Sequence, residues 1–179
     1  MEKKIFTRGW CSPERYVQGP GEFDNLKFYT DKFGKRIVAF IDEFLYEEFS
    51  ERLRLIYANS DCKLRAVAFC SEVTRDLINK HCNELCEWNS DLVIGIGGGK
   101  TIDVAKAVGT KLNLPFLVVP TIAATDAPTS SLSVIYREDG SHEGEFFYDH
   151  SPSVLIVDSK IIASAPVRFL VSGMGDALA

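Results

Sequence analysis

The chain has 179 residues, 46% of them hydrophobic, and its 25 acidic and 20 basic side chains give a formal net charge of −5. This length suits one well-filled domain, and the acidic balance offers no basic face for a phosphate backbone, which excludes nucleic acid as an expected partner. The sequence contains neither an apolar run near the roughly 20 residues of a membrane span nor an N-terminal signal-peptide pattern, so we expect a soluble, cytoplasmic protein.

Strand and helix patterns alternate along the first two thirds of the chain. After a short extended piece at 15–17, strands are predicted at 36–41, 64–69, 92–96 and 116–119, and helices at 43–57, 74–88 and 101–112. The strands are almost continuously apolar, as in sheets covered on both faces, and the helices repeat apolar residues every three or four positions. This order predicts an α/β fold with a doubly wound, mostly parallel, Rossmann-like sheet.

The remaining third departs from this alternation. Segments 132–137 and 145–148 flank Glu138-Asp139-Gly140 and predict an inserted β-hairpin. A last strand is predicted at 154–157, with Asp158 as the cap of the element that follows.

The C-terminal segment contains two helical starts, after Pro166 and after Gly173. The second has no remainder, and a helix of one or two turns is not stable alone. We therefore assign 1–165 to the α/β domain and 166–179 to the start of a truncated helical domain.

Five cysteines lie largely within apolar patterns: Cys11, Cys62, Cys70, Cys82 and Cys86. This favours buried thiols in a reducing compartment. Cys82 and Cys86, four apart on one predicted helix, have a spacing that could hold a metal, but no second ligand pair follows.

The 92–96 strand runs directly into three glycines, 97–99, and a predicted helix. Glycines let backbone N–H groups approach an anion closely, and a helix N-terminus adds unpaired donors and a partial positive charge. The run is neither a Walker loop, which would need glycine at Ile94, nor a GxGxxG fingerprint, which would need glycine at Lys100. We predict a site for a diphosphate cofactor, with a ligand-free tight turn as the alternative.

Ligands of open α/β sheets bind outside the carboxyl ends of the strands, where three further candidates lie. Asp42 follows the 36–41 strand and could accept from both ribose hydroxyls of an adenosine while repelling a 2′-phosphate, which favours NAD over NADP; a helix N-cap is an equally good interpretation. The 120–131 loop surrounds Asp126 with small hydroxyl residues suited to an amide or a sugar, or is an ordinary loop. Asp176, between glycine and alanine, is on its own better interpreted as a cap.

Three motifs in chain order resemble the glycerol dehydrogenases of the iron-containing alcohol dehydrogenase superfamily. They are 97–103 (GGGKTID), 125–136 (TDAPTS and LSVIY within it) and 173–178 (GMGDAL). The resemblance covers most of the chain and implies that 1–165 binds NAD. It also implies metal-dependent oxidation of glycerol, or a similar vicinal diol, to dihydroxyacetone in a full-length homo-oligomer. In that chemistry a metal lowers the pKa of the reacting alcohol, and the alkoxide passes hydride to the nicotinamide.

The resemblance also implies roles for individual residues. Asp42 would hold the adenosine ribose and Thr121 would contact the cofactor. Of two catalytic residues, Asp126 would meet the polyol and Asp176 would be a ligand of a divalent metal, usually zinc. The pyrophosphate would lie at Gly98, Gly99, Lys100 and Asp103, and the nicotinamide at Ser130, Leu132 and Tyr136.

One departure from the family's pattern concerns the metal. The family completes its metal site with two histidines from a helical C-terminal domain, which we expect to be absent here, and His81, His142 and His150 do not occupy matching positions. One carboxylate cannot replace the three protein ligands of a catalytic zinc. We therefore expect the cofactor half of the enzyme, inactive alone, either truncated or completed by another polypeptide.

Two other functions remain open. The chain could be a non-catalytic NAD-binding module or subunit that needs a partner chain. It could also be a polyol-phosphate dehydrogenase of the same superfamily, which the negative charge of Asp126 disfavours. Whether the chain is truncated or completed by another polypeptide, the surface that would pack against a helical domain is expected to be exposed and apolar.

Overall fold

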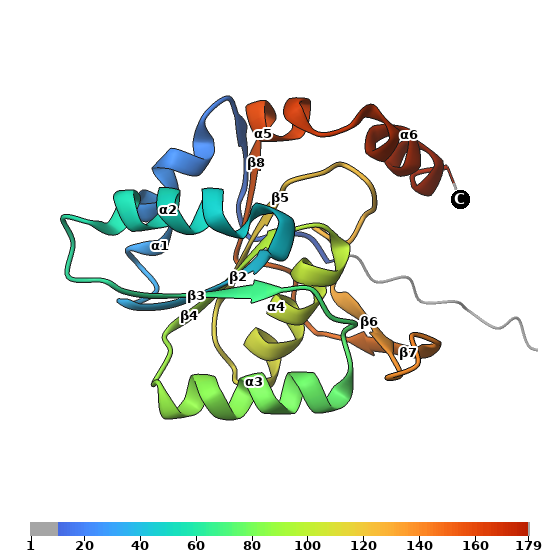
Figure 1. The fold of residues 1–179 in the computed structure, drawn as a ribbon, viewed down its shortest axis with the longest axis horizontal. Coiled ribbons are helices and arrows are strands. Elements are labelled where there is room, and N and C mark those ends of the chain that lie inside the picture. Colours follow the sequence, from blue (N-terminus) through green and yellow to red (C-terminus); the bar gives the residue numbers. More distant parts are fainter. Residues whose placement is uncertain (1–10, 179) are drawn as a thin grey trace, which may run out of the picture.

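The computed structural model describes residues 11–178. The predicted domain limits at residues 1 and 179 lie outside that range, as do the first residues, in which no signal-peptide pattern was found. Six parallel strands form one sheet in the order β1-β8-β5-β4-β2-β3, with helices on both faces (Figure 1). This is the predicted α/β, doubly wound sheet. The strands are β1 (Tyr16–Gly19), β2 (Arg36–Asp42), β3 (Lys63–Phe69), β4 (Leu92–Gly97), β5 (Phe116–Pro120) and β8 (Val154–Asp158).

The helices cover the two faces of the sheet, with α2 and α5 above it and α3 and α4 below it in Figure 1. None of them, within residues 11–178, is long and apolar enough to cross a lipid bilayer. The helical elements are η1 (Glu22–Asn25), α1 (Leu26–Thr30), η2 (Glu43–Leu45), α2 (Tyr46–Tyr57), α3 (Arg75–Glu87), α4 (Gly99–Lys111), α5 (Ser159–Ser164) and α6 (Val167–Asp176).

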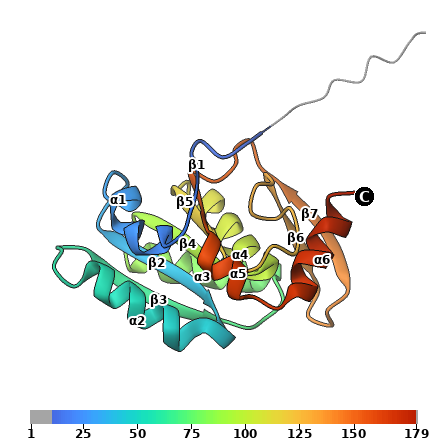
Figure 2. The same ribbon diagram turned by 90° about the horizontal axis from the view of Figure 1, so that it is seen from above.

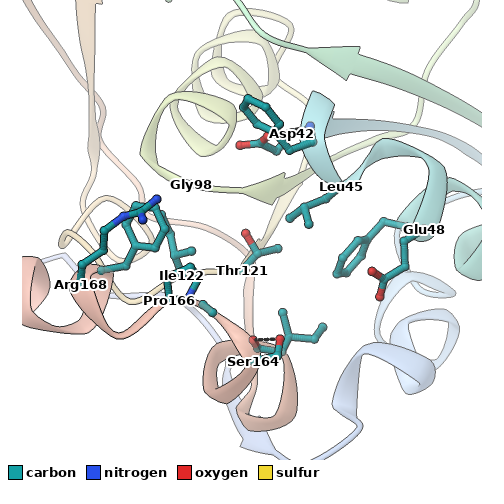
Figure 3. Close-up of a pocket in the computed structure, with 14 residues that line it drawn as sticks. Asp42, Leu45, Glu48, Gly98, Thr121, Ile122, Ser164, Pro166 and Arg168 are labelled. Carbon is teal, nitrogen blue, oxygen red and sulfur yellow. Dashed lines mark hydrogen bonds between the residues drawn. The ribbon is translucent and has the colours of Figure 1, made fainter.

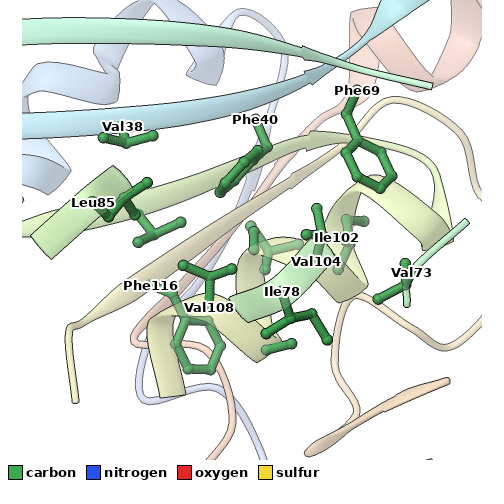
Figure 4. Close-up of a cluster of buried hydrophobic side chains, with 14 of the residues drawn as sticks. Val38, Phe40, Phe69, Val73, Ile78, Leu85, Ile102, Val104, Val108 and Phe116 are labelled. Carbon is green, nitrogen blue, oxygen red and sulfur yellow. The ribbon is translucent and has the colours of Figure 1, made fainter. Parts of the chain in front are cut away.

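Alternation along the strands divides the interior into two cores. In β2, Val38 and Phe40 face the helices α3 and α4, whereas Ile37, Ala39 and Ile41 face α1 and α2. Figure 4 shows the first core, in which Phe40 and Phe116 of the sheet lie against side chains of both helices, Ile78, Leu85, Ile102, Val104 and Val108. Because both faces are buried there, β2, β4, β5 and β8 read as nearly unbroken apolar runs in the sequence, whereas the edge strands β1 and β3 do not.

The central strand β4 places the glycine loop between two other strand ends. Ile96 is in register with Ile41 of β2 on one side and with Val119 of β5 on the other. The chain therefore leaves all three strands at the same level of one edge, where Gly97 lies opposite Pro120. Such an edge is where open α/β sheets bind their ligands.

The inserted hairpin is formed as predicted, by β6 (Leu132–Tyr136) and β7 (His142–Phe147), antiparallel and with a register shift between Ile135 and Tyr136. Gly140, with a φ of 80°, closes its turn. Figure 2 shows the hairpin beside α4, against which β6 packs. The backbone amide of Tyr136 donates a 2.9 Å hydrogen bond to the carbonyl of Val73, which holds the hairpin to the segment before α3.

Several local predictions differ from the structure. The predicted 43–57 helix begins with the 3₁₀ turn η2, and the 101–112 helix begins earlier, at Gly99. The two predicted helical starts after Pro166 and Gly173 are one helix, α6, which continues through Gly173 because that glycine packs against a neighbouring loop. The elements η1 and α1 were not predicted, since each is at most five residues long, whereas α5 follows Asp158, which caps it as predicted.

The cysteine prediction was mostly wrong. Cys82 is buried, Cys62 is half-buried, and Cys11, Cys70 and Cys86 are exposed free thiols. Cys82 and Cys86 lie on α3 with different environments, because only the first faces the core. The prediction of buried thiols failed because apolar residues next to a cysteine in the sequence do not show which face of a helix or strand its side chain occupies.

The helix α6 exposes a set of apolar side chains at helical spacing. Its exposed large hydrophobic residues, with the one that follows the helix, are Val167, Leu170, Val171, Met174 and Leu178. They form one apolar face, so the expected uncovered apolar surface is present on this helix.

Candidate functional site

A cavity of about 440 Å³ opens at the carboxyl edge of the sheet (Figure 3). Three residues predicted to contact a cofactor line it: Asp42 at the end of β2, Gly98 before α4, and Thr121 after β5. Thr121 is held by its backbone amide, which donates a 3.1 Å hydrogen bond to the carbonyl of Gly97. The three come from different strands, so the level ends of β2, β4 and β5 bring them together.

The glycine loop fits closely between its neighbours. Gly97 has a φ of 156°, and a Cβ there would lie 3.0 Å from the Cβ of Asp42 and 2.9 Å from that of Thr101. Gly98 is the N-cap of α4, and a Cβ on it would lie 3.1 Å from Cδ1 of Ile122. The first amides of α4 have no partner within the helix, so this cradle can donate several N–H groups to one anion.

Asp42 caps the short helix that follows it. Its Oδ1 accepts a 3.2 Å hydrogen bond from the backbone amide of Phe44, so the cap interpretation is correct. The cap uses one carboxylate oxygen, and Asp42 still lines the cavity, so capping does not exclude a second role. Glu48 is a second acid on the cavity wall, while Arg168 lies across from it in Figure 3.

Two other predicted cofactor residues, Lys100 and Tyr136, lie close to each other. Lys100 forms an ion pair with Glu72, and its Nζ lies 5.7 Å from the centre of the Tyr136 ring. Leu132, at the other end of β6, is half-buried and opposite Phe147 of β7. These residues lie on the hairpin side of the glycine loop, and none of them lines the cavity.

Asp103 faces the hairpin from α4 and is buried. Its Oδ2 accepts a 3.0 Å hydrogen bond from the backbone amide of Val134, and its backbone carbonyl accepts one of 2.8 Å from Ser133 Oγ. Its Oδ1 lies 2.9 Å from Nζ of Lys106, which is fully buried. Burial raises the pKa of Asp103 and lowers that of Lys106, while the attraction between the two opposes both shifts.

The predicted catalytic residues Asp126 and Asp176 are brought together across fifty residues of chain. The backbone amide of Asp126 donates a 2.8 Å hydrogen bond to Oδ2 of Asp176. Three positions before Asp176, a Cβ on Gly173 would lie only 2.2 Å from the carbonyl oxygen of Ala123. The helix α6 therefore packs directly on the backbone of the 121–131 loop.

The described residues do not fit a complete metal centre. Within 11–178, no three His, Cys, Asp or Glu side chains are grouped to hold an ion. His81 is buried against Phe40, His142 contacts Glu145, and His150 lies against Phe116. A catalytic zinc takes three protein ligands, so Asp176 would need others from elsewhere.

Sequence reasoning missed Lys106 and much of the cavity wall. Lys106 could have been found, because an ionisable residue inside the apolar run Val104–Val108 must have a buried partner. The wall residues come from three segments, which no spacing pattern links: Phe44 in η2, Ile122 after β5, and Arg168 and Phe169 in α6.

Comparison with known proteins gives a consistent picture. A model of the iron-containing alcohol dehydrogenase family matches residues 13–159. A glycerol dehydrogenase of Thermotoga maritima is 44% identical over 172 residues, which cover 93% of this chain and 45% of the relative. A glycolaldehyde reductase of Halobacterium salinarum is 37% identical, with 97% of this chain and 47% of the relative covered.

Solved structures agree with the sequence relatives. The crystal structure of a probable glycerol dehydrogenase from Sinorhizobium meliloti superposes with a TM-score of 0.87 at 38% identity, covering 96% of this chain and 46% of that one. The chain therefore spans a little under half the length of the proteins it matches.

Proposed function

Because the chain belongs to the iron-containing alcohol dehydrogenase family, a family of oxidoreductases, we propose that it is the NAD-binding part of a polyol dehydrogenase. Glycerol or a similar vicinal diol is the proposed substrate, and dihydroxyacetone the product from glycerol. The single observation that carries the proposal is the three-glycine cradle at the edge of the sheet, which opens beside Asp42 and Thr121 in one cavity.

The residues of the cavity suit the adenosine and diphosphate part of a dinucleotide. Amides of the first turn of α4 can bind the diphosphate. Asp42 can accept from the hydroxyls of the adenosine ribose, and a carboxylate there repels a 2′-phosphate, so NAD is preferred over NADP. The apolar wall formed by Leu45, Ile122 and Ile161 suits the adenine.

The 121–131 loop and the hairpin would serve the reacting end. NAD, when bound, supplies the hydride acceptor. Ser130, Leu132 and Tyr136 would line its nicotinamide, with Lys100 near the diphosphate, and the carboxylate of Asp126 would accept from a hydroxyl of the polyol. The relatives include both a glycerol dehydrogenase and a glycolaldehyde reductase, so small hydroxylated carbon chains are the proposed substrate class.

Asp176 is proposed as one ligand of a divalent metal, zinc in the first instance, with the other ligands outside residues 11–178. A full-length homo-oligomer in the cytoplasm is proposed on the family resemblance. The incomplete metal centre favours a second candidate, a non-catalytic NAD-binding module that acts with a partner chain.

Calorimetric titration of the 179-residue chain with NAD, and with NADP in parallel, tests the proposal. We expect saturable binding of NAD in preference to NADP. Asp42→Asn keeps a capping oxygen but removes the charge, and should weaken NAD binding about tenfold or more, because hydrogen bonds to charged groups contribute about 1.5–3 kcal/mol.

Asp61→Asn is the matched control, since Asp61 is an exposed acid paired with Lys35 before β3, at the opposite edge of the sheet. It should leave NAD binding unchanged. A folded wild-type chain that binds neither nucleotide would refute the proposal. The chain can also be co-expressed with the C-terminal half of a longer relative, which would supply the further metal ligands. Binding of NAD without diol oxidation in that mixture would favour the non-catalytic module.

A further inference from the structure

Lys106 is a fully buried lysine that none of the roles above uses. It lies on α4, two turns from the glycine cradle, and its side chain has no exposed surface. A buried ammonium group is costly unless ion pairing and hydrogen bonds replace its lost hydration. The groups that do so show what the residue holds in place.

Its ammonium group bridges α4 and the 121–131 loop. On the helix, Asp103 Oδ1 lies 2.9 Å away as an ion pair. On the loop, Nζ donates to the carbonyl of Ala127 at 2.8 Å and to Ser130 Oγ at 3.1 Å, with the Ser130 carbonyl at 3.4 Å. Ala127 directly follows Asp126, the predicted polyol residue, and Ser130 is itself one of the predicted nicotinamide residues.

The contact with Ser130 also fixes the direction of its hydroxyl. Because Lys106 donates to Ser130 Oγ, the serine proton points elsewhere, and in this structure it is directed at the Ala127 carbonyl over a long 3.3 Å. That carbonyl already accepts a shorter bond from Lys106. The serine can therefore exchange a weak internal acceptor for a ligand's acceptor at little cost.

We propose that Lys106 is a positioning residue that holds Ala127 and Ser130 so that the Ser130 hydroxyl donates to the carboxamide oxygen of the nicotinamide. This inference rests on the proposed binding of NAD. The adenosine and diphosphate groups bind at Asp42 and the glycine cradle, which Lys106 does not contact. Lys106 therefore affects one half of the cofactor and leaves the other unchanged.

The test compares NAD with ADP-ribose, which lacks the nicotinamide, by calorimetric titration of the full 179-residue chain. Lys106→Met should weaken NAD binding tenfold or more and ADP-ribose binding less than threefold. Lys111→Met is the control, because Lys111 lies on the same helix with its ammonium group on exposed Asn79. It should change neither affinity.

Ser130→Ala keeps the test decisive if Lys106→Met fails to fold, because it removes the hydroxyl and leaves the buried ion pair intact. It should weaken NAD selectively, by a smaller factor. Equal weakening of both ligands by these variants, or no weakening of either, would overturn the positioning role while the proposed function stands. A wild-type chain that binds neither ligand would overturn both.

Discussion

The backbone amide of Asp126 donates to the carboxylate of Asp176, at 2.8 Å, and so ties the loop after β5 to the helix α6. Asparagine at 176 can still accept this bond, whereas alanine cannot. We expect Asp176→Ala to speed hydrogen–deuterium exchange of the Asp126 amide roughly fivefold, for a bond of about 1 kcal/mol. In Asp176→Asn the Asp126 amide should exchange at nearly the wild-type rate. Equal exchange rates in both variants would show that the bond is not made in solution.

Gly173 fixes how closely α6 approaches the loop, and Gly175 is its natural control. A Cβ on Gly173 would lie 2.2 Å from the Ala123 carbonyl oxygen, whereas one on Gly175 meets nothing within 4 Å. Gly173→Ala should displace α6 at a cost of roughly 1–3 kcal/mol, and Gly175→Ala should stabilise the helix by roughly 0.5–1 kcal/mol. The rate of tryptic cleavage at exposed Arg168 reports how firmly α6 is docked. Faster cleavage is expected for Gly173→Ala and not for Gly175→Ala.

Asp158 should make stability depend on acid pH. It is almost fully buried and accepts from the amides of Gly21, Phe23 and Lys160. Burial alone would raise the pKa of Asp158, but these bonds together lower it. The stabilisation is therefore fully present above the ordinary carboxyl pKa of about 4 and is lost as the pH falls towards the lower folded value.

Asp158→Asn should accordingly lower the free energy of unfolding by about 1–3 kcal/mol at pH 7, with the difference from wild type shrinking below pH ~4. Urea denaturation at both pH values measures it. Asp149→Asn, in an exposed loop, should show no such pattern. A pH-independent loss in Asp158→Asn would mean that packing, and not the charge, is responsible.

Replacing Lys106 should lower the free energy of unfolding, because its ion-pair partner Asp103 would stay buried. In Lys106→Met, Asp103 remains buried without its cation, which should cost about 3–5 kcal/mol at pH 7. Burial already raises the pKa of Asp103, so protonation at lower pH should relieve part of this loss. The difference in the free energy of unfolding between Lys106→Met and the wild type should narrow as the pH falls from 7 to 5, and adding Asp103→Asn should remove this pH dependence.

The sheet and its binding edge could be predicted from sequence because their signals are local. The apolar run 92–96, which ends in glycines, predicted both a buried strand and a ligand-binding site after it. Asp103 and Lys106 show the opposite case. The sequence placed Asp103 with the cofactor by resemblance. Only the fold reveals that its carboxylate accepts from the amide of Val134, 31 residues away, and that Lys106 donates to Ser130, 24 residues away.

The contact between α6 and the 121–131 loop likewise had no local signal. Two glycines close together suggested an interrupted helix, since glycine lowers helix propensity. What overrides that propensity is the close approach of Gly173 to the Ala123 carbonyl, a tertiary contact between segments fifty residues apart.

The pairing of β1 with β8 has a consequence for how the chain is made. Tyr16 lies opposite Leu155, and Asp158 binds the amide of Gly21, a separation of 137 residues. At ~5–20 residues per second, the ribosome takes roughly 7–27 seconds to deliver the second strand after the first. Phe23, fully buried in the finished core, can pack on Phe49 of α2 soon after synthesis, but its backbone amide must wait in the nascent chain for Asp158. Within residues 11–178, the first strand in the chain is thus among the last to be paired, and its backbone donors and acceptors stay unpaired while the intervening residues are made.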